Sequence, residues 1–150
     1  MIGMAETATE TVVINAPAAQ VWDVVTALEH YPEWVKVIKD VVVRARDDQQ
    51  RPLEVEFRAS AFGRSTHYTL GYDYSRTPTA LSWNMVKGDI QRAIDGAYTF
   101  TENPDGTTTV VYDLAIELAT TLPGFVKRRA EVRILNTLRE LKARVEGTPA

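Results

Sequence analysis

The sequence predicts a single α+β domain in which a curved antiparallel sheet of seven strands covers one long C-terminal helix, in the order βααβ6α. Three observations lead to this prediction. A β-rich segment is followed at once by a short helical pattern, residues 37–118 alternate at strand period without helical spacing, and the chain closes on a helical period. A sheet that must cover one long helix has to bend around it.

The first strand and two short helices are expected before residue 35. Thr11–Ile14 is rich in β-branched residues, Asn15 is of a helix-capping type, and Pro17 stands where a first helical turn tolerates a missing N–H. Helical spacing then joins Val21, Trp22, Val25 and Leu28. Residues 30–32, His-Tyr-Pro, are expected to end the helix.

Turn signals at 47–50, 62–63, 76–78, 87–89 and 103–106 divide residues 37–118 into six strands. Because residues i and i+2 share a face, each strand has one apolar face that is expected to point inward. These faces comprise Leu53, Val55, Phe57 and Ala59; Tyr68, Leu70, Tyr72 and Tyr74; Leu81, Trp83 and Met85; Ile94, Gly96, Tyr98 and Phe100; and Val110, Tyr112, Leu114 and Ile116. One β-bulge would invert part of this assignment.

The last predicted element is a helix from Gly124 to about Glu146. Its apolar side chains recur at helical spacing, at Ala130, Ile134, Leu138, Leu141 and Val145. The same segment carries seven Lys and Arg side chains against three Glu, although the whole chain has a net charge of −3. We interpret these charges as a solvated face that pairs with the acidic body, and docking of an anionic partner is the alternative.

Composition points to one ordinary domain, with an ordered core at about 6–146. The chain has 150 residues, of which 45% are hydrophobic, and no cysteine, which excludes disulfides and thiolate chemistry. No apolar run reaches the roughly 18 to 20 residues of a membrane span, and residues 1–10 lack the pattern of a signal peptide. We therefore expect a cytoplasmic protein without stable membrane insertion, as a monomer or homodimer.

No catalytic or metal motif is present, so we predict no catalytic residue, no metal and no cofactor. Sequence patterns for nucleophilic triads, zinc sites and phosphate loops are missing. His30 and His67 are too isolated to form a metal site or a base with its orienting partner. Glu54 and Glu56 share an outward strand face, and no carboxylate occupies a predicted inner face.

Five of the six tyrosines fall on predicted inner faces. They are Tyr68, Tyr72, Tyr74, Tyr98 and Tyr112. Each buried hydroxyl without a partner costs about 1 to 3 kcal/mol, so a dry core would avoid this many. One interpretation is a partly wet ligand pocket, where rings supply apolar area and hydroxyls supply donors. The other is that β-forming aromatic residues fill a core and their hydroxyls reach its rim.

The beginning of the chain resembles a known superfamily. Ala16-Pro17, Val21-Trp22 and Tyr31-Pro32-Glu33-Trp34 are similar to the entry pattern of the Bet v 1-like/START (SRPBCC) superfamily, and within it of the bacterial polyketide cyclase/dehydrase and lipid transport proteins. The resemblance implies a helix-grip fold with a cavity between sheet and long helix. The residues then expected to bind ligand are Trp34, Val35, Phe57, Ala59, Tyr68, Leu70, Tyr72, Trp83, Met85, Gly96, Tyr98, Tyr112, Ala130 and Ile134.

Three functions are compatible with these observations. The first is a carrier or sequestering protein for a hydrophobic small molecule such as a lipid, a polyketide or an isoprenoid-like compound. The second is a polyketide aromatase/cyclase or dehydratase in which hydroxyls of Tyr68, Tyr72 or Tyr98 polarise a carbonyl. The third is a coenzyme Q-binding or ribosome-associated protein that docks a partner, which Tyr-Pro-Glu-Trp also resembles. The negative net charge argues against broad contact with nucleic acid.

Overall fold

The computed structural model describes residues 5–61, 64–118 and 136–147 of the chain. Its elements are β1 (Ala5–Ile14), α1 (Ala18–Thr26), the 3₁₀-helix η1 (Leu28–Glu33), β2 (Ile38–Arg46), β3 (Pro52–Ala61), β4 (Arg64–Asp73), β5 (Ala80–Gly88), β6 (Gln91–Glu102) and β7 (Thr108–Leu118). A C-terminal helix covers residues 136–146. The predicted first half of that helix lies outside the described residues.

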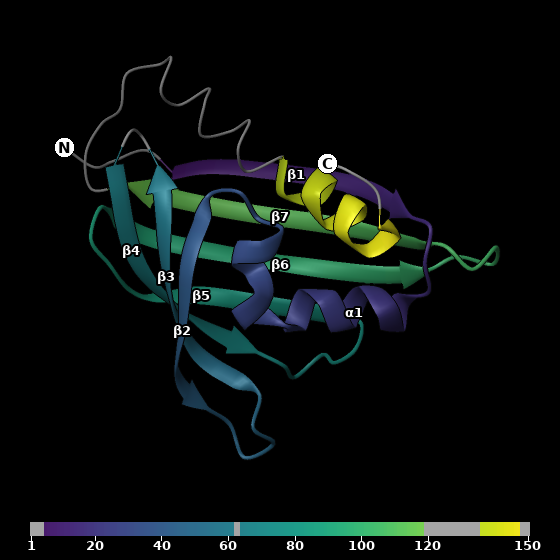
Figure 1. The fold of residues 1–150 in the computed structure, drawn as a ribbon, viewed down its shortest axis with the longest axis horizontal. Helices are drawn as coiled ribbons and strands as arrows, with labels where there is room; N and C mark the ends of the chain where they lie inside the picture. The colour runs from purple at the N-terminus through teal and green to yellow at the C-terminus, as the bar shows by residue number, and fades with distance from the viewer. Residues whose placement is uncertain (1–4, 62–63, 119–135, 148–150) are drawn as a thin grey trace.

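The seven strands form one antiparallel sheet in the order β1-β7-β6-β5-β4-β3-β2. Strands β2 to β7 follow one another as a meander, and β1 pairs with β7 at the far edge. The sheet is curved, and α1, η1 and the C-terminal helix all lie on one of its faces (Figure 1). The predicted fold class is therefore confirmed, and the interior lies between this face and the helices.

Two short helices follow β1, as predicted, but the boundary between them differs. Helix α1 begins after Pro17, ends at Thr26 and buries Val21 and Val25. Residues 30–32 do not end it, because they lie inside η1. Pro32 is compatible with a 3₁₀-helix, since the proline ring fixes φ near the helical value and the short helix loses only one N–H donor.

The inward faces predicted by alternation are buried or partly buried, with one exception. Val55, Phe57 and Ala59 on β3 are at most 5% exposed, but Leu53 on the same predicted face is 36% exposed. Pairing explains the difference: β2 and β3 shift register where Ala45 meets Glu54, so Leu53 lies at an irregularity that breaks the alternation. The prediction for Leu53 is therefore wrong.

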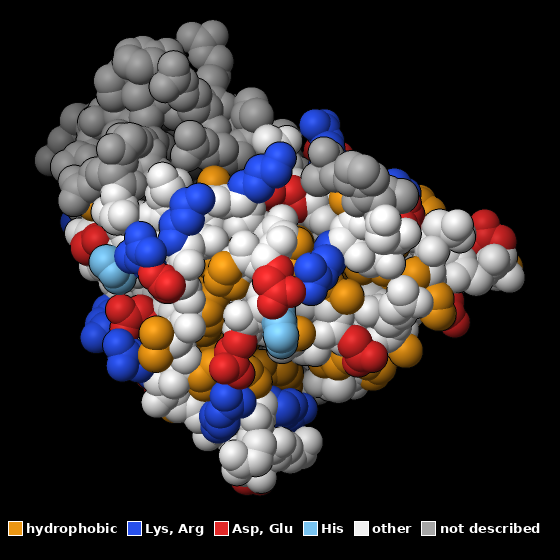
Figure 2. Space-filling view, viewed as in Figure 1, with side chains coloured by type: hydrophobic (Ala, Val, Ile, Leu, Met, Phe, Trp, Pro, Cys, Tyr) orange, Lys and Arg blue, Asp and Glu red, His pale blue; other side chains and the backbone are white. Residues whose placement is uncertain are grey.

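Surface charges of both signs are interspersed on the face that carries the helices (Figure 2). On the C-terminal helix, Arg144 pairs with Glu33 of η1 at 2.8 Å and Lys142 pairs with Glu146 at 2.8 Å. These two cations pair with acidic groups, in agreement with the first interpretation of the charged helix. The basic residues of 127–133 lie outside the described residues, so partner docking stays a prediction. Among the helices described, none is long and apolar enough to cross a membrane.

Candidate functional site

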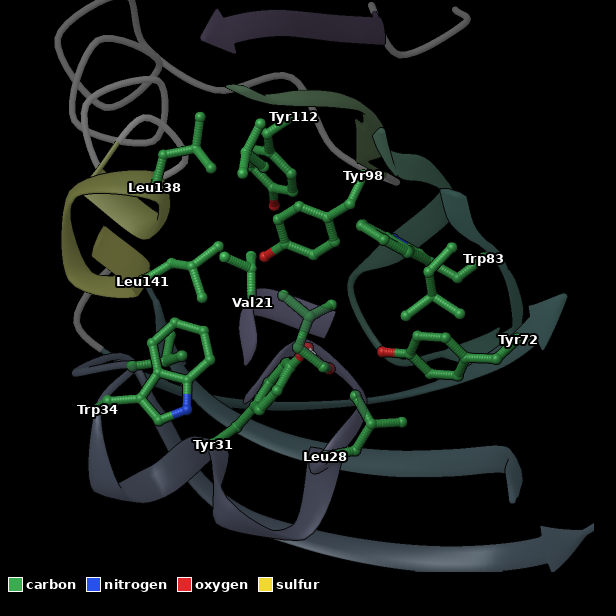
Figure 3. Packing of buried hydrophobic residues seen from close by; sticks show 14 of the residues in the cluster. Val21, Leu28, Tyr31, Trp34, Tyr72, Trp83, Tyr98, Tyr112, Leu138 and Leu141 are labelled. Atoms are coloured by element: carbon green, nitrogen blue, oxygen red, sulfur yellow. Dashed lines mark hydrogen bonds between the residues drawn. The ribbon is translucent and has the colours of Figure 1, made fainter. Parts of the chain in front are cut away.

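The interior is lined by side chains from the sheet, α1, η1 and the C-terminal helix. Val21 of α1 and Leu138 and Leu141 of the C-terminal helix are at most 1% exposed and face the aromatic side chains of the sheet (Figure 3). Leu28 and Tyr31 of η1 close the opposite side of the cluster. The fold thus brings residues more than one hundred positions apart to a single apolar interior.

Trp83 on β5 is the centre of the aromatic cluster. Its ring centroid lies 5.3 Å from that of Tyr98, 5.9 Å from Tyr72 and 6.1 Å from Tyr112. Gly96, directly opposite on β6, makes room for the indole: a Cβ there would stand 2.4 Å from Trp83 ring atoms. Gly96 faces inward as predicted, but the Trp83 indole covers it. Gly96 therefore contributes to the site by leaving room for Trp83.

Two tyrosines use their hydroxyls to hold the backbone in place. The Tyr31 hydroxyl donates to the carbonyl of Val25 at 2.5 Å, which is one of the last four carbonyls of α1 and has no partner inside that helix. The Tyr74 hydroxyl donates to the carbonyl of Pro52 at 2.7 Å, while the Arg51 guanidinium lies over the Tyr74 ring. We call Tyr31 and Tyr74 the anchoring tyrosines.

Tyr72 and Tyr98 behave differently, and we call them the interior tyrosines. Both residues are at most 7% exposed, and no hydrogen bond joins either hydroxyl to a residue that the structure describes. Neither oxygen is one of the fully enclosed side-chain atoms without a partner, which in the described residues are Thr69 Oγ1 and Gln91 Oε1. Both hydroxyls point toward the middle of the interior, that of Tyr98 toward Leu141 and Val21 (Figure 3). Burial raises the pKa of both phenols well above its usual value, so both stay protonated at neutral pH and can act as hydrogen-bond donors.

Tyr68 and Tyr112 extend the polar lining. Tyr68 is only partly buried, and its ring stacks on Phe57 with centroids 5.5 Å apart. Tyr112 is 7% exposed, and its ring stacks on Tyr98 at 4.9 Å. Burial raises the pKa of both hydroxyls, and for Tyr112 a side-chain hydrogen bond with Thr137 opposes part of the rise. Tyr68 on β4 and Tyr112 on β7 therefore add two further hydroxyls to the aromatic cluster.

The other predicted site residues divide between the same interior and its border. Phe57, Ala59 and Leu70 are buried on the sheet, and Met85 is partly buried and packs against the core. Trp34 and Val35 follow η1, and Trp34 packs edge-on against Tyr31 with centroids 4.9 Å apart. Ala130 and Ile134 lie outside the described residues, so their predicted role stays a prediction.

Glu140 is a buried carboxylate that sequence reasoning missed. It is 8% exposed, and its Oε2 accepts a hydrogen bond from the backbone N–H of Lys36 at 3.0 Å. After burial and the neighbouring tyrosines, Glu140 is one of the groups that raise the pKa of Tyr98. A helix gripped by a sheet is buried over a wide arc, as buried Ala143 also shows. The wide buried arc of the helix is the feature that indicates a buried Glu140, whereas the pattern of charged residues alone suggested that this face is exposed to solvent.

The histidines and strand charges lie away from the interior. His30 is exposed and bonds Glu33 at 2.6 Å, while His67 is exposed and lies 4.0 Å from Asp89. Arg58 of β3 pairs with Asp40 on the surface. Within the described ranges no group of three or more His, Cys, Asp or Glu side chains could hold a metal ion.

Comparison with known proteins identifies the family. Residues 5–146 match the family model described as polyketide cyclase/dehydrase and lipid transport. No curated protein is similar enough in sequence to count as a relative. A START superfamily protein from Mycobacterium smegmatis has a similar structure, with a TM-score of 0.85, 23% identity, and coverage of 94% of this chain and 97% of that chain.

Two further solved structures share the fold at lower identity. The Zhui aromatase/cyclase from Streptomyces sp. R1128 has a TM-score of 0.80 and 14% identity, covering 95% of this chain and 94% of its own. Ara h 8.0201 has a TM-score of 0.71 and 12% identity, covering 97% and 100%. At these identities the likeness shows the fold, and the family is shown by the match over residues 5–146. The chain therefore belongs to the polyketide cyclase/dehydrase and lipid transport family.

Proposed function

We propose that this protein binds a hydrophobic small molecule between the sheet and the C-terminal helix, and carries or sequesters it in the cytoplasm as a monomer or homodimer. The ligand class is a lipid, a polyketide or an isoprenoid-like compound. The proposed lining comprises Trp34, Val35, Phe57, Ala59, Tyr68, Leu70, Tyr72, Trp83, Met85, Tyr98 and Tyr112, with Gly96 seating Trp83 and with Ala130 and Ile134 on the C-terminal segment.

The interior tyrosines carry this proposal. A hydroxyl that is buried without a partner is costly, and phenylalanine would fill the same space without that cost. Tyr72 and Tyr98 point their hydroxyls, which have no hydrogen-bond partner among the described residues, into an interior whose other side chains are aromatic rings and aliphatic groups. An apolar wall with a few oriented donors is the usual composition of a small-molecule site. A ligand with polar atoms near these hydroxyls would satisfy them.

The direct test is titration with the neutral fluorophore N-phenyl-1-naphthylamine, whose emission rises in an apolar site. We expect saturable binding with one site per chain. Ala59→Trp, which places an indole on the inner face of β3, should abolish it, whereas Thr101→Trp on the exposed face of β6 should not. Circular dichroism checks that both variants fold, and Leu70→Trp replaces Ala59→Trp if that one does not. Binding that is absent from wild type, or unchanged in a folded filled variant, would contradict the proposal.

A second candidate is a cyclase or dehydratase, because Glu140 supplies the interior carboxylate that strand parity did not. A protonated Tyr98 can donate a hydrogen bond to a substrate carbonyl, and a buried carboxylate can accept a proton from an adjacent carbon. Both groups are buried, and Glu140 is one of the groups that raise the pKa of Tyr98. Tyr68 and Tyr72 are the other candidate donors of this alternative.

Turnover of a poly-β-ketone thioester mimic separates this candidate from the carrier. If the protein is an enzyme, Glu140→Gln should lower kcat by a hundredfold or more, a typical general-base contribution, and change KM little. Glu146→Gln is the matched control on the same helix, because the Glu146 carboxylate is paired with Lys142 and accepts the Asn15 N–H. Binding of the mimic with no product in wild type would leave the carrier function and remove the enzyme.

A further inference from the structure

A polar cluster lies at the end of the interior where β4, β5 and β6 meet. Thr66 near the start of β4 is 1% exposed, and Gln91 at the start of β6 is 9% exposed. Gln91 Nε2 donates to Thr66 Oγ1 at 3.0 Å, and Thr66 Oγ1 donates to Asp89 Oδ1. A buried amide at the edge of an apolar interior needs both of its ends satisfied.

The direction of every hydrogen bond in this cluster is fixed by Asp89. Its carboxylate accepts the backbone N–H groups of His67 at 2.9 Å and Ile90 at 2.6 Å, as an ionised carboxylate does. Since a carboxylate only accepts, the Thr66 hydroxyl must donate to it, and its oxygen is then free to accept from Gln91. The Gln91 amide therefore turns its NH₂ toward Thr66 and its carbonyl oxygen away from Thr66.

That carbonyl oxygen, Gln91 Oε1, has no hydrogen-bond partner in the part of the chain that the structure describes. It lies over Gly88, where an added Cβ would come within 2.9 Å of it and within 2.8 Å of Met85 Sδ. Gly88 is directly opposite Tyr68 in the ladder, so the oxygen lies on the inner face of the sheet beside Tyr68. The result is a buried acceptor, held by a fixed amide, at one end of the tyrosine-lined interior.

We infer that Gln91 Oε1 is a polar subsite that receives the O–H of the ligand, and that the ligand class is an apolar molecule with an alcohol or phenol hydroxyl at one end. This inference rests on the proposed function and adds the polarity of the ligand. The oxygen of an ether or ketone at the same place would face Gln91 Oε1 with no proton between the two acceptors, so no hydrogen bond would form. A carboxylate would do so with a negative charge, so ionised fatty acids are disfavoured in this orientation.

Two probes that differ in one group test the subsite. 2-Naphthol and 2-methoxynaphthalene share a ring system, but only the naphthol has an O–H. We expect calorimetry to show that wild type prefers 2-naphthol, and that Gln91→Met lowers the ratio of the two affinities about tenfold, the size of one hydrogen bond to a buried acceptor. Gln49→Met, in the exposed turn after β2, should leave the ratio unchanged.

A second variant leaves Gln91 in place and guards against misfolding of the first. Thr66→Val is nearly isosteric but removes the hydroxyl that orients the amide, so the preference for the O–H should fall here too. The outcomes separate the two proposals. Binding of both probes with a ratio that neither variant changes would overturn the subsite and leave the pocket, whereas binding of neither probe to wild type would overturn the pocket and the subsite together.

Discussion

The anchoring tyrosines and the interior tyrosines differ in what their hydroxyls contact. Tyr72 lies near the end of β4 and Tyr74 directly follows that strand, and their ring centroids are 6.5 Å apart. The Tyr74 hydroxyl donates a hydrogen bond to the carbonyl of Pro52, whereas the Tyr72 hydroxyl has no hydrogen-bond partner among the described residues. Two tyrosines only two positions apart in sequence therefore have different roles. One stabilises the fold, and the other presents a donor to the interior.

The two classes of tyrosine are expected to differ in what their hydroxyls contribute to the free energy of unfolding. Satisfied hydroxyls contribute net stability of about 0.5 to 1.5 kcal/mol each, while unsatisfied ones subtract from it. Natural domains are marginally stable, so two interior hydroxyls that no described residue bonds are expected to have a role other than stabilising the fold. The ligand binding that we propose would provide such a role, because polar atoms of the ligand would form hydrogen bonds with these hydroxyls.

The largest effect on stability is expected at the contact between Gly96 and Trp83, next to the interior tyrosines. Gly96→Ala should displace the Trp83 indole, because the new Cβ would lie 2.4 Å from the ring. We expect a loss of about 1 to 3 kcal/mol in the free energy of unfolding, measured by urea denaturation. Gly71→Ala on β4 is the control, since its Cβ would meet only ordinary contacts at 3.4 Å or more. Equal effects of the two substitutions would show that Trp83 is not held by this contact.

The next effect distinguishes the two tyrosine classes directly. Tyr31→Phe removes the hydrogen bond to the Val25 carbonyl and should destabilise the protein by about 1 to 2 kcal/mol. Tyr98→Phe removes a hydroxyl without a described partner, and we expect a change near zero or a small gain. Urea unfolding of both variants in the ligand-free protein gives the comparison. A loss at Tyr98 as large as at Tyr31 would mean that the hydroxyl is satisfied, and would remove the main support for the pocket.

The fold was predictable because its signals are local and repeated. Strand alternation put the aromatic side chains on one face, and the helical spacing of Val21 and Val25 located α1. The two errors have different origins, one in strand pairing and one in local helix geometry. Leu53 is exposed because β2 and β3 shift register, and residues 30–32 continue as η1 instead of ending a helix.

The candidate site was predictable only as a set of inward positions. Parity placed Tyr72 and Tyr74 on the same face, but it could not show that only Tyr74 reaches a carbonyl 22 residues away in sequence. Glu140 and Gln91 were missed for the same reason. Their burial depends on what the sheet brings against them, and their residue types are usually exposed. Hydrogen-bond partners are properties of the assembled fold.

A smaller effect concerns binding. Tyr98→Phe should weaken binding of a carbonyl-bearing apolar probe such as 2-acetylnaphthalene about fivefold, because one neutral hydrogen bond from the buried phenol is lost. Tyr74→Phe should leave the affinity unchanged, since that hydroxyl already donates to Pro52. Calorimetric titration measures both. Equal affinities for wild type and Tyr98→Phe would show that the hydroxyl does not meet the probe, and a loss at Tyr74 would remove the distinction between the classes.

The smallest effect is the alkaline one, and its sign follows from the pKa shifts. Burial raises the pKa of Tyr74 to about 12 and that of Tyr72 and Tyr98 well above its usual value, whereas unfolded tyrosine ionises near 10. Above pH 10 the unfolded chain therefore holds fewer protons than the folded one, so this contribution to stability is complete below pH 10 and is lost as pH rises through the folded pKa values.

Removing one such phenol should make the protein less sensitive to alkali. We expect Tyr98→Phe to move the midpoint of alkaline unfolding upward, and Tyr74→Phe to move it less, because Tyr74 is the less strongly shifted of the two. Phenolate absorbance at 295 nm and circular dichroism, recorded together, give the two midpoints. If Tyr98 ionised before the fold was lost, water would reach its hydroxyl freely in the ligand-free protein. The interior tyrosines would then differ from the anchoring ones in solvent access rather than in an unmet hydrogen bond.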